Sequence, residues 1–244
     1  MSLSQHISQE HKISSSAQYI SEIVYGGIDG IVTTFAVVAW FAGAGAENAI
    51  VQIWATSVIL FGLANLFGDG VSMALGKYLS TRSEQDVYMT AWKKERHEIT
   101  HNEHMEYDES VEILVDQGMS AEDATQSVDI LQRYPELWTK WMMDNELQLA
   151  DCREDNALIQ GAITLFSFIV FGSIPLIPYL FMEGAMHWEL SLIMTGAALL
   201  LLGIVRRYVT RMHIAKTIFQ VFILGGVAAG VAYYTGELVM KFLG

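Results

Sequence analysis

The chain has 244 residues, 52% of them hydrophobic, and a formal net charge of −13 at pH 7. Apolar residues at this density, gathered in long runs, are typical of a polytopic membrane protein rather than a soluble domain. The single cysteine excludes an intramolecular disulfide and a cysteine-rich zinc site. The first twenty residues are polar and lack the features of a cleaved signal peptide, so we expect the first apolar run to act as its own insertion signal.

Five apolar runs are long enough to cross a bilayer, because each can bury about 20 residues in hydrocarbon. Pro175 and Pro178 in the third run predict a bend or an early helix end. The sequence therefore predicts an all-α membrane protein with five transmembrane helices and a cytoplasmic three-helix insertion between the second and the third. The five runs cover residues 19–46, 50–79, 157–182, 190–205 and 217–240.

Small residues recur inside three of these runs, and they let membrane helices approach closely, either within one bundle or along a dimer seam. Glu22 and Glu237 lie near the ends of runs, where we expect them to face the membrane interface. The small residues are Gly26, Gly27 and Gly30 in the first run, Gly68, Gly70 and Gly76 in the second, and Gly225, Gly226, Ala229 and Gly230 in the fifth.

The acidity of the chain is concentrated in residues 82–155, which hold 19 Asp and Glu against 7 Lys and Arg. This balance suits cations as partners and argues against nucleic acid. We expect three helices here. The first covers residues 83–117 and stops at Gly118, and the second covers residues 120–134 with Ser120 as its N-cap. Pro135 opens the third, which runs to about residue 154.

Basic residues predict the orientation, because short cytoplasmic loops are enriched in Lys and Arg. Arg206, Arg207, Arg211 and Lys216 follow the fourth run, whereas residues 46–49 and 182–189 contain neither Lys nor Arg. The N-terminus and residues 82–155 are then cytoplasmic, and the C-terminus lies on the opposite side. In a bacterium the host would be the plasma (inner) membrane.

Two carboxylates stand inside the first two runs, where a charge costs a few kcal/mol or more and is kept mainly for function. Asn65, Asp69, Met73 and Lys77 are four residues apart and form a drifting polar stripe that we expect to face Asp29. Asp29 and Asp69 would then bind an ion or carry protons, and Met73 would add a sulfur ligand. Alternatively, Asp69 pairs with Lys77 or a hydroxyl as a structural group, and Asp29 lies near the interface with access to water.

Four glutamates and an asparagine share one face of the first insertion helix. At 100° per residue, Glu95, Glu98, Asn102, Glu106 and Glu109 fall in a stripe about 80° wide. Like charges at this spacing repel each other and weaken the helix. The stripe therefore needs a compensating cation, either from other side chains or from bound metal.

The third insertion helix carries thioethers beside a carboxylate. Met142, Met143 and Glu146 lie within about 100° of one another on a helix. This mixture of ligands suits Fe²⁺, Mn²⁺, Co²⁺ or Zn²⁺ better than Ca²⁺ or Mg²⁺. The alternative is that the glutamates form a solvated acidic face and the two methionines fill the core.

At these residues the chain resembles the vacuolar iron transporter family. The matching stretches are EIVYGGIDGIVTTFAVVAWFAGAG, GDGVSMALGKYLSTRSEQD, ERHE followed by EYDE, WMMDNEL and FGSIPLIPYL. The resemblance implies a homodimer with a cytoplasmic metal-binding domain that exports Fe²⁺, and often Mn²⁺ or other divalent ions, in exchange for protons. By position, Asp29 and Met73 match the family's membrane ligands. Its cytoplasmic ligands match Glu95, Glu98, Glu106, Glu109, Met142, Met143 and Glu146.

Two positions depart from the family pattern. Lys77 stands where the family has an acid, and Asn65 stands where some members have a second membrane carboxylate. Both changes remove negative charge from the expected path, which bears on proton coupling and ion preference, and Asp69 can supply part of the lost charge. We expect three segments: the tail and first two membrane helices in residues 1–81, the acidic metal-binding domain in 82–155, and the last three membrane helices in 156–244.

The expected function is a secondary transporter, not an enzyme, with Fe²⁺ or a similar ion as substrate and no prosthetic group. Its expected partners are divalent metal ions, protons, the lipid bilayer and a second copy of the chain. One alternative is a membrane-anchored di-iron oxidase, although such bundles use Glu-x-x-His and the insertion has Glu-x-x-Glu. The other is a membrane-anchored metal sensor or buffer, against which Asp29 and Asp69 argue.

Overall fold

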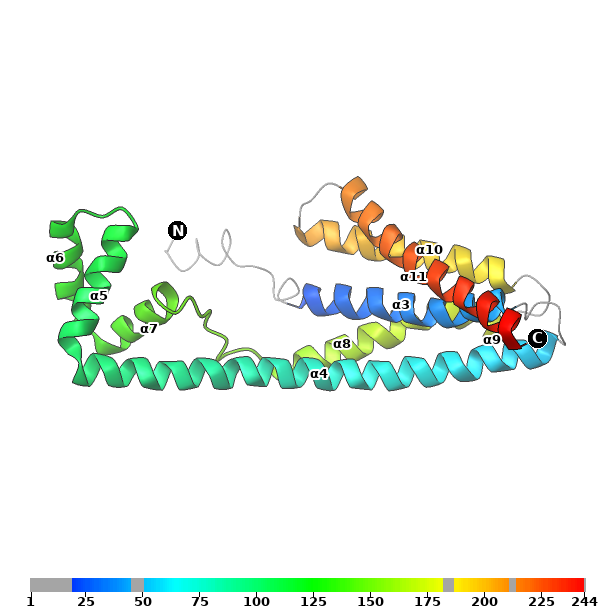
Figure 1. Cartoon of the computed structure of the whole chain (residues 1–244), viewed down its shortest axis with the longest axis horizontal. Helices are drawn as coiled ribbons and strands as arrows, with labels where there is room; N and C mark the ends of the chain where they lie inside the picture. The colour runs from blue at the N-terminus through cyan, green and yellow to red at the C-terminus, as the bar shows by residue number, and fades with distance from the viewer. Residues whose placement is uncertain (1–18, 45–50, 182–186, 211–213, 244) are drawn as a thin grey trace, which may run out of the picture. The chain divides into compact units, whose positions relative to one another are not determined.

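The computed structural model describes residues 19–44, 51–181, 187–210 and 214–243, and the regular elements in these ranges are helices (Figure 1). The chain divides into two compact units, which we call the membrane unit (Met1–Tyr78 with Leu158–Gly244) and the acidic unit (Leu79–Ala157). Helix α4 (Val51–His101) contributes residues to both. The expected links at residues 46–49 and 182–186, the tail and Arg211 lie outside the described residues.

Four stretches are long and apolar enough to cross a membrane, which agrees with four of the five expected spans. The fifth expected span falls on α11, a 30-residue helix with several side chains outside the described residues, so the five-span layout stays a prediction. The four stretches are Ile20–Gly43, Trp54–His101, Ala157–Phe181 and His187–Arg207. Besides α4, the helices of this unit are α3 (Ile20–Gly43), α8 (Ala157–Gly172), η3 (Ile174–Leu176), α9 (Ile177–Phe181), α10 (His187–Thr210) and α11 (Ile214–Leu243).

The α-helix of the third apolar run is interrupted where its prolines predict. Helix α8 ends at Gly172, a short 3₁₀ turn containing Pro175 follows, and α9 continues the run for five residues. Proline lacks a backbone N–H and its ring collides with the preceding turn, so a straight α-helix cannot pass through this stretch. The predicted early end of the helix is therefore confirmed.

Helix α3 packs against α8 with backbone touching backbone. A Cβ atom at Gly26 would lie 2.6 Å from the carbonyl oxygen of Thr164, and one at Gly30 would collide with the carbonyl oxygen of Phe168. Small residues at these two positions thus set the helix separation, as expected from the sequence. By contrast, no described atom lies within 4 Å of a Cβ at Gly68 or Gly76.

Aromatic and aliphatic side chains fill the rest of the membrane unit. One face of α3 meets α10, and further along α3 a second cluster joins α4 and η3. The first cluster consists of Ile31, Ala198, Leu199 and Leu202. The second consists of Phe35, Val38, Phe41, Val58 and Leu176.

The acidic unit is a small helical bundle with its own core. Ser120 caps α6 by accepting a hydrogen bond from the Asp123 backbone N–H, and Pro135 occupies the first turn of α7, as the sequence predicts. The helices that follow α4 are α5 (Glu103–Asp116), α6 (Ala121–Leu131) and α7 (Pro135–Asn145). Their core consists of Ile99, Leu114, Ala124, Val128, Trp138 and Met142.

For two helices of this unit, the ends predicted from the sequence are wrong. A single helix over residues 83–117 does not form, because α4 runs on to His101 and Asn102 interrupts it with φ −124° and ψ 34°. Asparagine leaves the helical backbone readily, since its side chain competes for backbone hydrogen bonds. The third helix ends at Asn145 rather than near residue 154, and Gln148 then adopts a positive φ of 53°.

The segment after α7 is held on α4 by side chains rather than by helical hydrogen bonds. The Gln85 side-chain amide donates to the backbone carbonyls of Cys152 and Asp155, at 3.0 and 2.8 Å. The Arg153 guanidinium lies 4.4 Å from the centre of the Trp92 ring and pairs with Asp151. These contacts satisfy backbone groups that a helix would otherwise have paired.

Candidate metal centre

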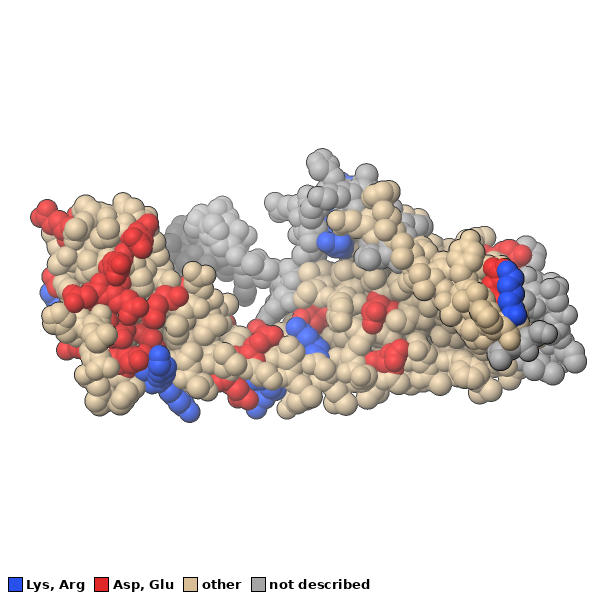
Figure 2. Space-filling view, in the orientation of Figure 1, with Lys and Arg blue, Asp and Glu red and all other residues tan. Residues whose placement is uncertain are grey.

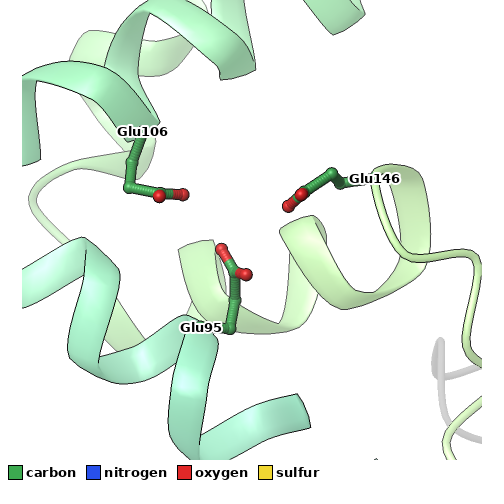
Figure 3. Close-up of side chains that lie close together, drawn as sticks. All are labelled: Glu95, Glu106 and Glu146. Atoms are coloured by element: carbon green, nitrogen blue, oxygen red, sulfur yellow. The ribbon is translucent and has the colours of Figure 1, made fainter. Parts of the chain in front are cut away.

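Three glutamates from separate parts of the acidic unit converge on one point (Figure 3). Glu95 comes from α4, Glu106 from α5, and Glu146 directly follows α7. One carboxylate oxygen of each lies within 4.8 Å of the others. The chain changes direction at Asn102 (Figure 1), so that α5 presents Glu106 to Glu95 across the junction of the two helices.

The three carboxylates carry unsatisfied negative charge. Glu95 and Glu106 are 3% and 6% exposed, and one buried oxygen of each of the three glutamates has no hydrogen-bond partner within the described part of the chain. Burial, and then the charge of Glu106, raises the pKa of Glu95 to about 8. Burial likewise raises the pKa of Glu106 and of Glu146. Such a cluster holds protons or a divalent cation, because either one neutralises the repulsion.

Two further predicted ligands, Glu98 and Glu109, stand at the edge of this cluster. Glu98 is partly exposed and pairs with Lys94 at 3.4 Å. Glu109 is exposed, yet its charge contributes to the raised pKa of Glu106 and of Glu146. Figure 2 shows acidic side chains gathered on the acidic unit around this region. A cation approaching the three buried carboxylates therefore crosses a negative surface.

The two predicted methionine ligands are both fully buried. Met142 belongs to the apolar core, and its sulfur accepts a hydrogen bond of 3.1 Å from the Ser110 hydroxyl. The Trp138 indole N–H donates in turn to the Ser110 oxygen at 2.8 Å. Nothing in the helical pattern of the sequence indicated Ser110 or Trp138 as parts of this centre. Metal ligation by Met142 and Met143 stays a prediction.

In the membrane unit, two of the predicted path residues, Asp29 and Asp69, lie near each other. Asp29 is half-buried and close enough to Asp69 for their charges to interact. It lines a cavity of about 680 Å³ that is otherwise mostly apolar and has Arg206 in its wall. The Asp69 residue is exposed and Met73 is half-buried, as judged within the described residues of this single chain. Asn65 keeps a buried side-chain nitrogen without a hydrogen-bond partner among described residues.

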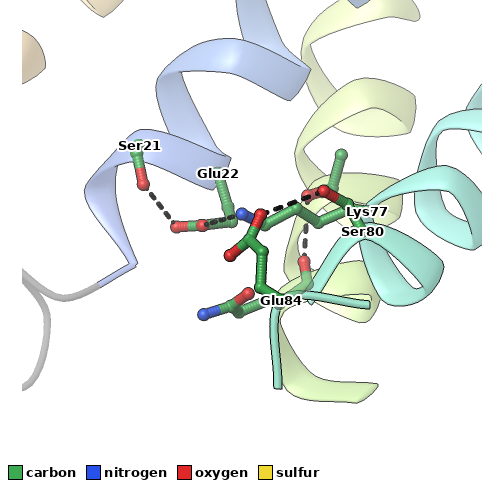
Figure 4. A network of polar contacts seen from close by, with 7 residues as sticks. Ser21, Glu22, Lys77, Ser80 and Glu84 are labelled. Atoms are coloured by element: carbon green, nitrogen blue, oxygen red, sulfur yellow. Dashed lines mark hydrogen bonds and ion pairs between the residues drawn. The ribbon is translucent and has the colours of Figure 1, made fainter. Parts of the chain in front are cut away.

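Lys77 has a partner that the sequence did not indicate (Figure 4). Its Nζ lies 3.2 Å from Oε1 of Glu22, which is only 4% exposed and also accepts a 2.8 Å hydrogen bond from Ser21 Oγ. The expectation that Glu22 faces the membrane interface is therefore wrong, and the ion pair of Lys77 is with Glu22 rather than with Asp69. The sequence pattern did not indicate this pair, because a glutamate at the end of an apolar run is usually expected at the membrane interface.

Comparison with known proteins identifies the family of this chain. The family model described as the VIT family matches residues 20–237. Vacuolar iron transporter 1 of Eucalyptus grandis is 31% identical over 241 residues, covering 97% of this chain and 94% of the relative. The vacuolar iron transporter of Toxoplasma gondii is 30% identical over 246 residues, covering 97% and 79%. Vacuolar iron transporter 1 of Arabidopsis thaliana is 30% identical over 227 residues, covering 92% and 88%. The chain thus belongs to the VIT family, the vacuolar iron transporters.

Proposed function

We propose that this protein moves Fe²⁺, and related divalent ions such as Mn²⁺, out of the cytoplasm in exchange for protons. The relatives are named vacuolar iron transporters, which supports a transporter rather than the oxidase. The proposed assembly is a homodimer, with the acidic unit in the cytoplasm. If the host is a bacterium, the membrane is the plasma membrane and the ion leaves the cell.

The observation that carries this proposal is the convergence of Glu95, Glu106 and Glu146. Their oxygens lie close enough to share one cation, and buried oxygens lack other partners among described residues. Glu98 and Glu109 would draw cations toward them, and Met142 or Met143 would add a softer ligand suited to Fe²⁺ or Mn²⁺. The acidic unit then collects the ion from the cytoplasm.

The crossing itself is assigned to Asp29, Asp69 and Met73. A carboxylate at bilayer depth is kept mainly where it binds an ion or a proton. The charges of Asp29 and Asp69 already interact, so a dication between them would relieve their repulsion. Protonation of these carboxylates on the far side would release the ion and complete one exchange.

The test is Fe²⁺ uptake into liposomes that contain the purified full-length protein, with and without an inside-acid pH gradient. Asp29→Asn and Met73→Ala are compared with Glu237→Gln, a matched control at an exposed carboxylate of α11 that pairs with Lys241. Uptake that the gradient stimulates, and that only the first two variants lose, supports the proposal.

Other outcomes contradict distinct parts of it. Uptake that ignores the gradient would refute proton exchange and leave a uniporter. Full uptake by Asp29→Asn and Met73→Ala would refute the path. No uptake of Fe²⁺, Mn²⁺ or another divalent ion would refute transport and favour the metal sensor.

A further inference from the structure

Two pairs of charged residues lie along one seam between α3 and α4. Glu22 pairs with Lys77, and Asp29 interacts electrostatically with Asp69. The residue number rises along α3 as it falls along α4, which is the register of two antiparallel helices. Seven residues separate Glu22 from Asp29 on α3, so the two pairs are about two turns, or 10 Å, apart.

The two pairs differ in how their charge is balanced. At one level the charge of a buried carboxylate, Glu22, is balanced by the ammonium of Lys77, and the carboxylate also accepts a hydrogen bond from Ser21. At the other level two carboxylates, Asp29 and Asp69, stand near each other. A buried ionised carboxylate that loses its cation is strongly unfavourable, so ionised Glu22 needs a positive charge beside it.

Lys77 is placed at the end of the seam that is adjacent, along α4, to the start of the acidic unit at Leu79. A dication that moves along the seam from this end meets the ammonium before it meets Asp29. Two positive charges at contact distance repel each other strongly in a site with little water. If Lys77 moves away, Glu22 is free to bind the ion in its place.

We propose that Lys77 is a displaceable counter-ion of Glu22, and that a metal ion replaces its ammonium on Glu22 on the way to Asp29 and Asp69. The Lys77 side chain is 33% exposed whereas Glu22 is 4% exposed. The lysine therefore has an open side toward which it can swing, and the carboxylate stays in the seam. This inference rests on the proposed transport function and adds Glu22 and Lys77 to its path.

The competition between Lys77 and the metal ion gives a kinetic signature. Removing the ammonium by Lys77→Gln leaves Glu22 open to the dication, so the KM for Fe²⁺ uptake falls. The maximal rate also falls, because the more tightly held ion leaves more slowly. Lys77→Arg keeps the positive charge and should hold the KM at or above the parental value. Removing both charges in Glu22→Gln/Lys77→Gln should raise the KM above that of the parent.

The experiment measures uptake against Fe²⁺ concentration for these full-length variants in liposomes. Lys241→Gln is the matched control, since this lysine forms an exposed ion pair with Glu237 on α11, and its KM should equal the parental value. If Lys77→Gln lowers only the amount of folded protein and leaves the KM unchanged, the ion pair has a purely structural role and the inference is overturned. If Lys77→Gln does not fold, the double variant decides, and a parental KM there overturns it. A parent protein without uptake would instead refute the proposed function.

Discussion

The indole N–H of Trp138 donates a 2.8 Å hydrogen bond to the Ser110 hydroxyl in the core of the acidic unit. Both side chains are completely buried, and the Ser110 hydroxyl in turn donates a hydrogen bond to the sulfur of Met142. One small hydroxyl therefore ties α5 to two positions on α7. This link fixes the distance between the helices that carry or precede Glu106 and Glu146.

Ser110→Ala should destabilise the acidic unit, because it leaves the buried Trp138 N–H without an acceptor. A buried donor without a partner costs about 1–3 kcal/mol. Denaturant unfolding of the full-length protein in detergent, followed by tryptophan fluorescence, measures the loss. Ser127→Ala, at a partly exposed serine of α6, is the control and should change stability by less than about 0.5 kcal/mol. Equal stability of both variants would contradict the assigned role of Ser110.

Glu146→Gln should have opposite effects with and without metal. Without metal the variant should be more stable than the parent, because it removes one of three repelling buried carboxylates. The affinity for Mn²⁺ should fall at least about tenfold. Loss of a residue that only supports a metal ligand already costs about 10–100-fold, and Glu146 would be a ligand itself. Calorimetric titration and thermal unfolding measure the two effects.

The control for this pair of effects is Glu112→Gln, at an exposed glutamate on α5. It should leave the Mn²⁺ affinity close to that of the parent, since only diffuse surface charge is lost. Parental affinity in Glu146→Gln would show that the converging carboxylates do not bind the ion.

The metal-free acidic unit should lose stability as the pH rises. The pKa of Glu95 is about 8 in the folded protein, against an ordinary value of 4.5. Between these values the folded state binds more protons than the unfolded state, so the free energy of unfolding falls with increasing pH. Below about pH 4.5 and above about pH 8 this contribution no longer changes. Thermal unfolding in the presence of a chelator, from pH 6 to pH 8, measures the slope.

Glu95→Gln should flatten this slope, because the amide does not titrate. Over the same pH range the apparent affinity for Mn²⁺ should rise in the parent, since the metal competes with protons that are fewer at higher pH. A metal affinity that is constant from pH 6 to pH 8 would contradict ligation by these carboxylates.

Gly30→Ala should disrupt the membrane unit, since its methyl group would collide with the Phe168 carbonyl on α8. Overpacking of this kind costs about 1–3 kcal/mol, and here the obstacle is backbone that cannot rotate away. The fraction of monodisperse protein in detergent measures the effect. Gly226→Ala on α11, where no described atom lies within 4 Å, should keep the parental yield, and equal losses in both variants would refute the packing argument.

The beginnings of elements were predictable because local chemistry sets them. Ser120 and Pro135 mark helix starts, and Pro175 and Pro178 mark an early helix end, through hydrogen bonds and ring sterics that involve only near neighbours. The break at Asn102 and the helix end at Asn145 were not predictable in this way. Helical periodicity continues through both places in the sequence. After Asn145, tertiary contacts such as those of Gln85 with the Cys152 and Asp155 carbonyls replace the helical hydrogen bonds.

The glutamate stripe named two of the three converging residues, Glu95 and Glu106, for an incorrect geometric reason. On one continuous helix Glu95 and Glu106 would be eleven residues, or about 16 Å, apart along the axis, too far to share an ion. The interruption at Asn102 brings their oxygens within 4.8 Å instead. The Glu22–Lys77 pair escaped prediction because nothing in either helix alone indicates which residues face each other across the seam.

The convergence of residues 95, 106 and 146 also affects the conformational entropy of the unfolded chain. With a single cysteine, the acidic unit has no internal disulfide to restrict its unfolded state. A cation held by all three carboxylates would close two successive loops, one short and one of about forty residues, and remove part of the entropy that unfolding gains. The transported ion would then act as a removable cross-link. Binding of the ion would stabilise the acidic unit, and its release would lower that stability again.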